Sequence, residues 1–187
     1  MKQSELDKYE YIKCTKGLGY GGSNHAKNHY PILRKLFKGL PAYTGVLDIG
    51  CGTGKFPLWL KQEFPKLHVV GVDPVFVEDG SFTDGVSFFK GDTTNIPLIV
   101  DVITAFDVLE HLHPDDLISS LTRIDECTSV LFIAKICTRE SHYKIEGRED
   151  TPLHMIVKPL EWWQDMFKEH TTFKSIVIDD GLLICYK

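Results

Sequence analysis

The sequence predicts a doubly wound α/β fold, in which a largely parallel sheet carries helices on both faces. The first observation is a series of short apolar runs bounded by Gly, Pro or Asp, at Val46–Ile49, Val69–Val72, Val86–Phe89, Val102–Ala105 and Val130–Ala134. Their hydrophobicity is continuous rather than alternating, which is typical of strands that are covered on both faces. The second observation is that helical patterns lie between or after these runs, at Leu58–Phe64, Leu117–Ile124 and Trp162–Phe167. Such alternation indicates βαβ units.

Two segments depart from this regular alternation. Only a dozen residues, two of them glycines, separate Asp73 from Val86. The crossover helix expected there must therefore be reduced to about one turn. Near the end of the chain, Phe173–Ile178 and Leu182–Tyr186 are separated by Asp-Asp-Gly, which is a tight-turn signal between two strands. We therefore expect a terminal antiparallel hairpin on an otherwise parallel sheet.

The bulk composition is that of one ordinary globular domain spanning 1–187. The chain has 187 residues, of which 43% are hydrophobic and 25% charged, and its formal net charge is −5. This acidic balance argues against a broad phosphate-binding surface, although a local basic patch is not excluded. No apolar run approaches the roughly 18 residues that a membrane span needs, and residues 1–12 contain no signal peptide.

The five cysteines are scattered through the sequence, and no two of them form a C-x-x-C pair. This spacing fits neither a disulfide framework nor a zinc site. We therefore interpret them as the reduced thiols of a cytoplasmic protein.

The most informative segment is the glycine-rich turn in Val46–Phe56, where a predicted buried strand runs into a helix. Glycines let the backbone approach a ligand closely, and the start of a helix offers unpaired N–H groups. The dinucleotide motif G-x-G-x-x-G fails because Lys55 stands where the last glycine is needed. The P-loop motif fails because Ile49 replaces its first glycine and Phe56 follows the lysine. The pattern that remains is D-x-G-x-G-x-G.

An acidic residue follows the second predicted strand. Asp73 lies about 20 residues beyond the glycine turn, and a carboxylate in this place can accept both hydroxyls of a ribose. The alternative is that Asp73 serves as a helix cap or turn residue. If it binds ribose, the change Asp73→Ala should weaken cofactor binding and alter stability little.

Together these features resemble class I S-adenosylmethionine-dependent methyltransferases, over roughly Pro41–Asp116. The resemblance implies a sheet of seven strands in the order 3-2-1-4-5-7-6, with strand 7 antiparallel, and S-adenosylmethionine as the cofactor. It also implies that Asp48 faces the methionine amino group, that Asp92 contacts the adenine amino group and that Phe106 lies against the cofactor. A simple turn is the alternative role for Asp92. The cofactor-binding residues implied in this way are Asp48, Gly50, Cys51, Gly52, Gly54, Asp73, Asp92, Thr93 and Phe106.

The segment D-V-L-E-H-L that begins at Asp107 resembles one found in small-molecule methyltransferases, including ubiquinone-pathway O-methyltransferases. It implies transfer of a methyl group to a small-molecule acceptor at oxygen. Because the methyl group of the sulfonium is already electrophilic, such an enzyme mainly aligns the nucleophile and, where necessary, removes its proton. The candidate catalytic residues are His111, Glu110 and His154. The alternatives are a structural role for Glu110 and His111 and a cap or surface position for His154.

Two other functions remain open. The same segment resembles, more loosely, the E-x-x-E-H element of metal-dependent small-RNA 2′-O-methyltransferases, so that a divalent metal could be bound by Asp107, Glu110, His111 and His154. We assign no metal ligand from the sequence, and nucleic acid is not excluded as a partner. The third possibility is a subunit that binds S-adenosylmethionine without catalysing a reaction.

Two segments are expected to lie near the substrate. Residues 1–40 form an N-terminal helical segment in which glycine-rich Gly17–His29 serves as a lid or as a plain linker. Ile136–Lys158 follows the fifth predicted strand, where this fold places substrate-covering loops. Neither segment carries a motif that names the acceptor, and the sequence leaves the oligomeric state open.

Overall fold

The structure is a computed structural model, and it describes residue 10 and residues 24–96, 98–141 and 152–187. Most of the predicted lid Gly17–His29 and the middle of Ile136–Lys158 lie outside these residues. Among the described residues, no helix has both the length and the apolar character that crossing a bilayer requires. The described cysteines are all free thiols.

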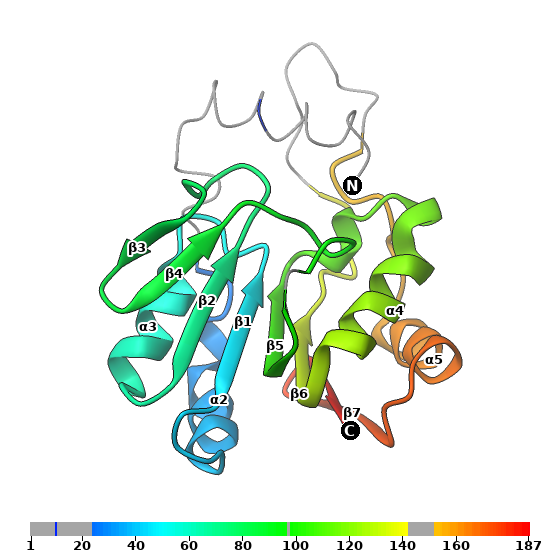
Figure 1. The fold of residues 1–187 in the computed structure, drawn as a ribbon. Helices are drawn as coiled ribbons and strands as arrows, with labels where there is room; N and C mark the ends of the chain where they lie inside the picture. Colours follow the sequence, from blue (N-terminus) through cyan, green and yellow to red (C-terminus); the bar gives the residue numbers. More distant parts are fainter. Residues whose placement is uncertain (1–9, 11–23, 97, 142–151) are drawn as a thin grey trace.

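A single eight-stranded sheet forms the centre of the molecule, in the order β3-β4-β2-β1-β5-β6-β8-β7 (Figure 1). Its parallel part consists of β1 (Gly45–Ile49), β2 (His68–Val72), β4 (Val86–Phe89), β5 (Val100–Phe106) and β6 (Thr128–Lys135). Without β3, this order is the predicted 3-2-1-4-5-7-6.

The predicted C-terminal hairpin is present. It consists of β7 (Ser175–Asp179) and β8 (Leu182–Tyr186), and β8 lies antiparallel between β6 and β7. The turn that joins the two strands contains Asp180 and Gly181, both with positive φ.

The connection between β2 and β4 differs from the prediction of about one helical turn. It contains instead the strand β3 (Ser81–Thr83), which pairs antiparallel with β4 and gives the sheet one strand more than expected. Asp84 and Gly85 join the two strands with φ values of 49° and 82°, as an Asp-Gly hairpin turn requires. A dozen residues suffice for this short hairpin, whereas they are close to the minimum of about 10–12 for a whole crossover that includes a packed helix.

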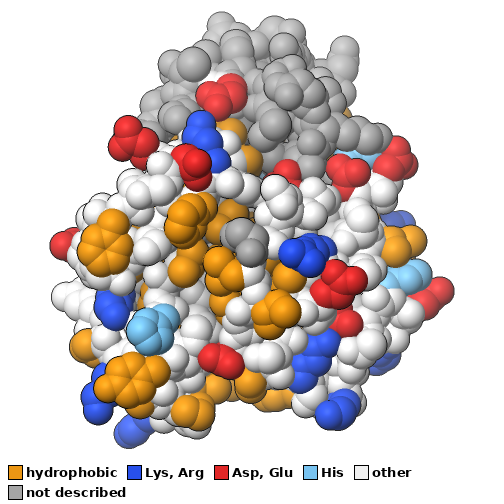
Figure 2. Space-filling view, viewed as in Figure 1, with side chains coloured by type: hydrophobic (Ala, Val, Ile, Leu, Met, Phe, Trp, Pro, Cys, Tyr) orange, Lys and Arg blue, Asp and Glu red, His pale blue; other side chains and the backbone are white. Residues whose placement is uncertain are grey.

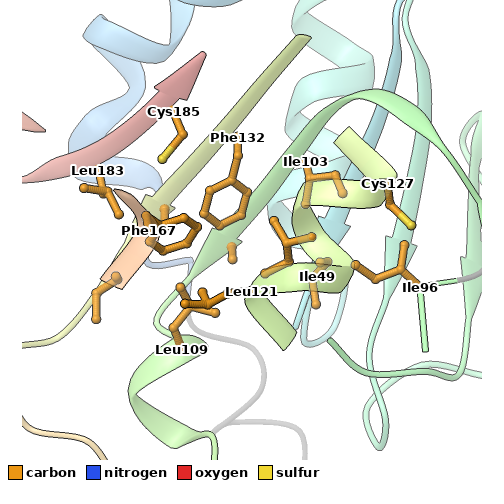
Figure 3. Packing of buried hydrophobic residues seen from close by; sticks show 14 of the residues in the cluster. Ile49, Ile96, Ile103, Leu109, Leu121, Cys127, Phe132, Phe167, Leu183 and Cys185 are labelled. Carbon is orange, nitrogen blue, oxygen red and sulfur yellow. The ribbon is translucent and has the colours of Figure 1, made fainter. Parts of the chain in front are cut away.

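Two pairs of helices cover the two faces of the sheet (Figure 1). On one face, α2 (Tyr30–Lys38) and α3 (Lys55–Glu63) pack with one set of buried residues, including Leu33 and Leu60. On the other face, α4 (Leu117–Cys127) and α5 (Leu160–His170) pack with a second set (Figure 3). There Phe132 of β6 and Phe167 of α5 stack with their ring centroids 5.2 Å apart. This two-sided burial explains the continuous hydrophobicity of the central strands.

Candidate active site

A cavity of about 480 Å³ lies at the carboxyl ends of the parallel strands, where ligands bind in open α/β sheets. Loops that follow β1, β2, β4, β5 and β6 contribute to its wall, and Asn24, His25 and Ala26 contribute from the segment before α2. Eight of the nine predicted cofactor-binding residues line this cavity, namely Asp48, Gly50, Cys51, Gly52, Asp73, Asp92, Thr93 and Phe106. The chain therefore brings residues from four separate loops to one place.

The glycine turn is fixed by its backbone. Gly50 and Cys51 donate N–H hydrogen bonds to the carbonyl of Val72 at 2.7 and 3.1 Å. Gly50 has a φ of 67°, and a Cβ atom there would lie 2.4 Å from the side chain of Val108. Any other residue at this position would force the end of β1 away from the loop that follows β5.

Gly54 is the one predicted cofactor residue that does not line the cavity. It precedes α3 with a φ of 83°, and a Cβ atom there would lie 2.6 Å from the ring of Phe88. Its observed role is therefore to let the start of α3 pack closely against β4.

Asp73 holds the loops around it together. Asp73 is 5% exposed. Its carboxylate accepts hydrogen bonds from the N–H groups of Gly52 at 2.9 Å, Val75 at 2.9 Å and Phe76 at 2.8 Å. The turn role considered from the sequence is thus present. Because this carboxylate satisfies three backbone donors, we revise the expectation that Asp73→Ala leaves stability almost unchanged. The ribose role stays a prediction.

Asp48 lies at the floor of the cavity and is 3% exposed. The hydroxyl of Thr104, its neighbour across the β1–β5 pairing, donates a hydrogen bond to its Oδ1 at 2.7 Å. Burial raises the pKa of Asp48 to about 8, despite that hydrogen bond. This carboxyl therefore carries its proton at neutral pH as long as no cation approaches it.

The remaining predicted cofactor residues form the cavity wall beyond β4 and β5. Asp92 accepts hydrogen bonds from the N–H and the hydroxyl of Thr94 at 2.8 and 2.6 Å, which is the turn role considered for it. The hydroxyl of Thr93 lies 2.8 Å from that of Ser120. Phe106 is buried at the end of β5 and lines the cavity. Contact of these side chains with adenine stays a prediction.

At the other end of the cavity, Asp107 is held by the side chains of His25 and Lys135, which the sequence did not reveal as its partners. His25 Nδ1 lies 2.6 Å from Asp107 Oδ2, and Lys135 at the end of β6 makes an ion pair with Oδ1. Burial opposes ionisation, but the hydrogen bonds from His25 and Lys135 outweigh it and lower the pKa of Asp107 to about 2. No local pattern could have revealed these partners, because they lie 82 and 28 residues away in the chain.

Glu110 lies in the 3-10 helix η3 (Leu109–His111) and has no exposed surface. Its Oε1 accepts a hydrogen bond from the N–H of Cys137 at 2.9 Å, whereas its buried Oε2 accepts no hydrogen bond from the described residues. Burial, then the negative charge of Asp107 and a hydrogen bond between the two carboxyl groups, raise the pKa of Glu110 well above its ordinary value. This side chain lies behind the cavity wall rather than in its lining.

The two predicted catalytic histidines meet at the cavity wall. The ring centroids of His111 and His154 are 4.7 Å apart, with their planes nearly perpendicular. His111 Nδ1 lies 2.9 Å from the carbonyl of Leu153, and His154 Nδ1 lies 2.6 Å from that of Arg139. Because a carbonyl oxygen only accepts, the Nδ1 atom of each ring must carry a proton. Burial lowers the pKa of His111 to about 4, so this ring is neutral at physiological pH.

Comparisons with known proteins agree with this geometry. The model of a family described as a methyltransferase domain matches residues 27–179. No curated protein matches the chain significantly.

Solved structures share the fold at low sequence identity. PH0226 protein from Pyrococcus horikoshii OT3 has a TM-score of 0.66 and 18% identity, over 95% of this chain and 98% of that one. Magnesium protoporphyrin IX methyltransferase from Synechocystis PCC 6803, with bound S-adenosylhomocysteine, has a TM-score of 0.60 and 14% identity, over 99% of this chain and 95% of that one. Haemonchus contortus phosphoethanolamine N-methyltransferase 2, with phosphomonomethylethanolamine and S-adenosylhomocysteine, has a TM-score of 0.67 and 17% identity, over 92% of this chain and 46% of that one. The chain thus spans about half the length of this last protein, and it spans 50% of PigF with S-adenosylhomocysteine.

Proposed function

Because the chain belongs to the methyltransferase domain family, we propose that it transfers a methyl group from S-adenosylmethionine to an oxygen atom of a small-molecule acceptor. The observation that carries this proposal is one cavity whose lining joins the glycine turn and its acids to His111. When bound, the cofactor supplies an electrophilic methyl group. The protein then has to hold the acceptor oxygen in line with that methyl group and exclude water.

The cofactor end of the cavity suits a cationic nucleoside. The methionine amino group of the cofactor would lie near Asp48, the ribose near Asp73 and the adenine near Asp92, as the resemblance implies. Approach of an ammonium group to Asp48 would favour the charged carboxylate, because an opposite charge lowers the pKa of a buried acid. Cofactor binding near neutral pH is then accompanied by release of a proton from Asp48.

The acceptor end offers a hydrogen-bond acceptor for a hydroxyl group. The hydrogen bond between His111 Nδ1 and the carbonyl of Leu153 fixes the ring at the cavity wall. In its neutral form the ring can accept a hydrogen bond from an acceptor hydroxyl through Nε2. A hydroxyl that donates to this nitrogen presents its own lone pairs for attack on the methyl group. His111 is therefore the residue that we expect to orient the acceptor oxygen.

A small acceptor fits the charge of the chain better than RNA does. The formal net charge is −5, and on the face shown in Figure 2 the Lys and Arg side chains are scattered among acidic and apolar ones. RNA binding relies on a positively charged surface that neutralises phosphates. Two of the structural neighbours also have small acceptors in their names or complexes, phosphomonomethylethanolamine and magnesium protoporphyrin IX.

The test combines calorimetry with a transfer assay. S-adenosylhomocysteine should bind the wild-type chain in equimolar amount, and binding in buffers of different ionisation enthalpy should reveal the proton released by Asp48. Radiolabelled S-adenosylmethionine should then label small phenols, alcohols or carboxylic acids in a panel that also contains amines, thiols and bulk RNA. His111→Ala should lower turnover at least about tenfold with unchanged S-adenosylhomocysteine affinity. His113→Ala, two residues away and outside the cavity lining, is the matched control. Labelling of RNA alone, or no binding of S-adenosylhomocysteine, would overturn the proposal.

A further inference from the structure

We propose that Glu110, Cys137 and His154 bind a zinc ion beside the acceptor end of the cavity. One donor atom from each of the three lies within 4.8 Å of the other two. The donors come from η3, from the chain just after β6 and from the segment before α5. Donor atoms around a tetrahedral zinc ion lie about 3.5 Å apart, given zinc–ligand distances of about 2.0–2.3 Å. A side-chain adjustment of about 1 Å would therefore bring these three onto one ion.

One oxygen of Glu110 accepts no hydrogen bond and can bind a cation. Glu110 is 0% exposed, and its Oε2 accepts no hydrogen bond from the described residues. In the metal-free chain a proton shared with Asp107 satisfies this oxygen. A divalent cation can replace that proton, because metal ligands bind in their deprotonated form. Oε1 is already occupied by the N–H of Cys137, so the same contact that fixes the carboxylate brings the thiol of that residue close.

The orientation of His154 is that of a metal ligand. Its Nδ1 donates to the carbonyl of Arg139 at 2.6 Å, so Nε2 is the nitrogen that would bind the ion. Metal-binding histidines characteristically donate the proton of their other nitrogen to a carbonyl or carboxylate, and this contact fixes both tautomer and ring plane.

The identity of the donors favours zinc over magnesium. One thiolate, one imidazole and one carboxylate form a set typical of zinc, whereas magnesium prefers oxygen atoms alone. Asp107, which the sequence suggested as a ligand, is held by Lys135 and His25, and Cys137 takes its place as the third donor. Cysteine spacing could not reveal this site, because only one ligand is a cysteine.

Three protein ligands leave the fourth position of a tetrahedral ion open. Cys137 and His154 both line the cavity, so that position faces the space where the acceptor is expected. A zinc ion there would bind an acceptor oxygen and lower the pKa of its hydroxyl group. This last role rests on the proposed function, whereas the ion site itself does not.

The first experiment measures metal binding by the complete chain. Reduced protein freed of metal with a chelator is titrated with Zn²⁺ by calorimetry, and separately with Co²⁺ by absorption spectroscopy. We expect one ion per chain and, with Co²⁺, a thiolate-to-metal charge-transfer band. Cys137→Ser should abolish that band, and His154→Ala should weaken Zn²⁺ binding more than about tenfold. Glu110→Gln retains an acceptor for the N–H of Cys137 and should also weaken binding.

Controls separate this site from others and from the proposed function. Cys127→Ala and His113→Ala remove a thiol and an imidazole outside the three-residue cluster, and both should leave the affinity and the cobalt band unchanged. Thermal melts of all metal-free variants identify any that fail to fold. No Zn²⁺ binding by the wild type, or binding that survives both Cys137→Ser and His154→Ala, overturns the site. S-adenosylhomocysteine titrations of the same samples report separately on the proposed methyl transfer.

Discussion

Asp48 in β1 and Asp107, which directly follows the neighbouring strand β5, line the same cavity, yet their environments have opposite effects on charge. Asp48 is buried with one hydroxyl donor, and burial, together with the negative charge of Asp73, raises its pKa to about 8. Asp107 is also mostly buried, but His25 and Lys135 lower its pKa to about 2. The cofactor end therefore presents a neutral acid that is ready to meet a cation, whereas the acceptor end presents a carboxylate whose charge is already compensated.

The difference follows from how each end is built. At the cofactor end the partners are uncharged, because Asp48 accepts from a hydroxyl and Asp73 from backbone N–H groups. At the acceptor end the partners of Asp107 are the side chains of a lysine and a histidine. Each of the following variants tests one side of this contrast.

The largest effect is expected for Asp48→Asn. Between about pH 4 and pH 8 the unfolded chain has lost the Asp48 proton while the folded chain keeps it, so wild-type stability should fall as pH rises. The slope from this group is up to about 1.4 kcal/mol per pH unit, and the variant should lose it. Urea unfolding at several pH values measures the slope, with exposed Asp165→Asn as control. Parallel curves for Asp48→Asn and wild type would mean that Asp48 is ionised in the free protein.

Asp73→Ala should lower the free energy of unfolding by about 3 kcal/mol at neutral pH, because three N–H groups, two of them in buried hydrogen bonds, lose their acceptor. Asp79→Ala, which removes the acceptor of a single exposed N–H, should cost less than about 1 kcal/mol. Chemical denaturation measures both. Equal losses in the two variants would show that Asp73 does not hold the glycine turn.

Asp107→Asn should lower the free energy of unfolding by about 2 kcal/mol at neutral pH, because the lowered pKa of Asp107 reflects stabilisation of its charged form in the folded chain. That stabilisation is present above the unfolded pKa of about 4 and disappears as pH falls through the folded value of about 2. The stability difference between wild type and variant should therefore shrink in acid. Denaturation at neutral pH and between about pH 4 and pH 2 tests this, and a pH-independent difference would contradict it.

The smallest effect is expected for His25→Ala. The side chain of His25 is 48% exposed, and an ion pair of this kind contributes less than about 1 kcal/mol. Lys135→Met should lower the free energy of unfolding more than His25→Ala does, because Lys135 is the less exposed of the two partners of Asp107. A double-mutant cycle with Asp107→Asn measures both couplings, and a larger value for His25 would reverse their order.

The sequence was most informative where neighbouring residues determine the structure. The glycine turn and Asp73 could be recognised because a strand, a turn and a helix follow one another within Val46–Asp73, and their spacing is fixed by backbone geometry. The β3 hairpin was missed because the strand before Asp84-Gly85 has only three residues. So short a segment shows no alternation of apolar and polar side chains. The partners of Asp107 and the approach of Cys137 to Glu110 depend on which strands become neighbours, so no local pattern predicts them.

The hairpin that replaces the first crossover helix also limits how the protein can associate. Strands at the margin of a sheet expose unpaired N–H and C=O groups to which other chains can add. β3 has only three residues, and positive-φ residues flank it at Gly80 and Asp84, so the backbone turns away at both ends. A strand of a second polypeptide could therefore form only a few backbone hydrogen bonds with β3. At that margin the short strand protects the chain against uncontrolled growth of the sheet from one molecule into the next.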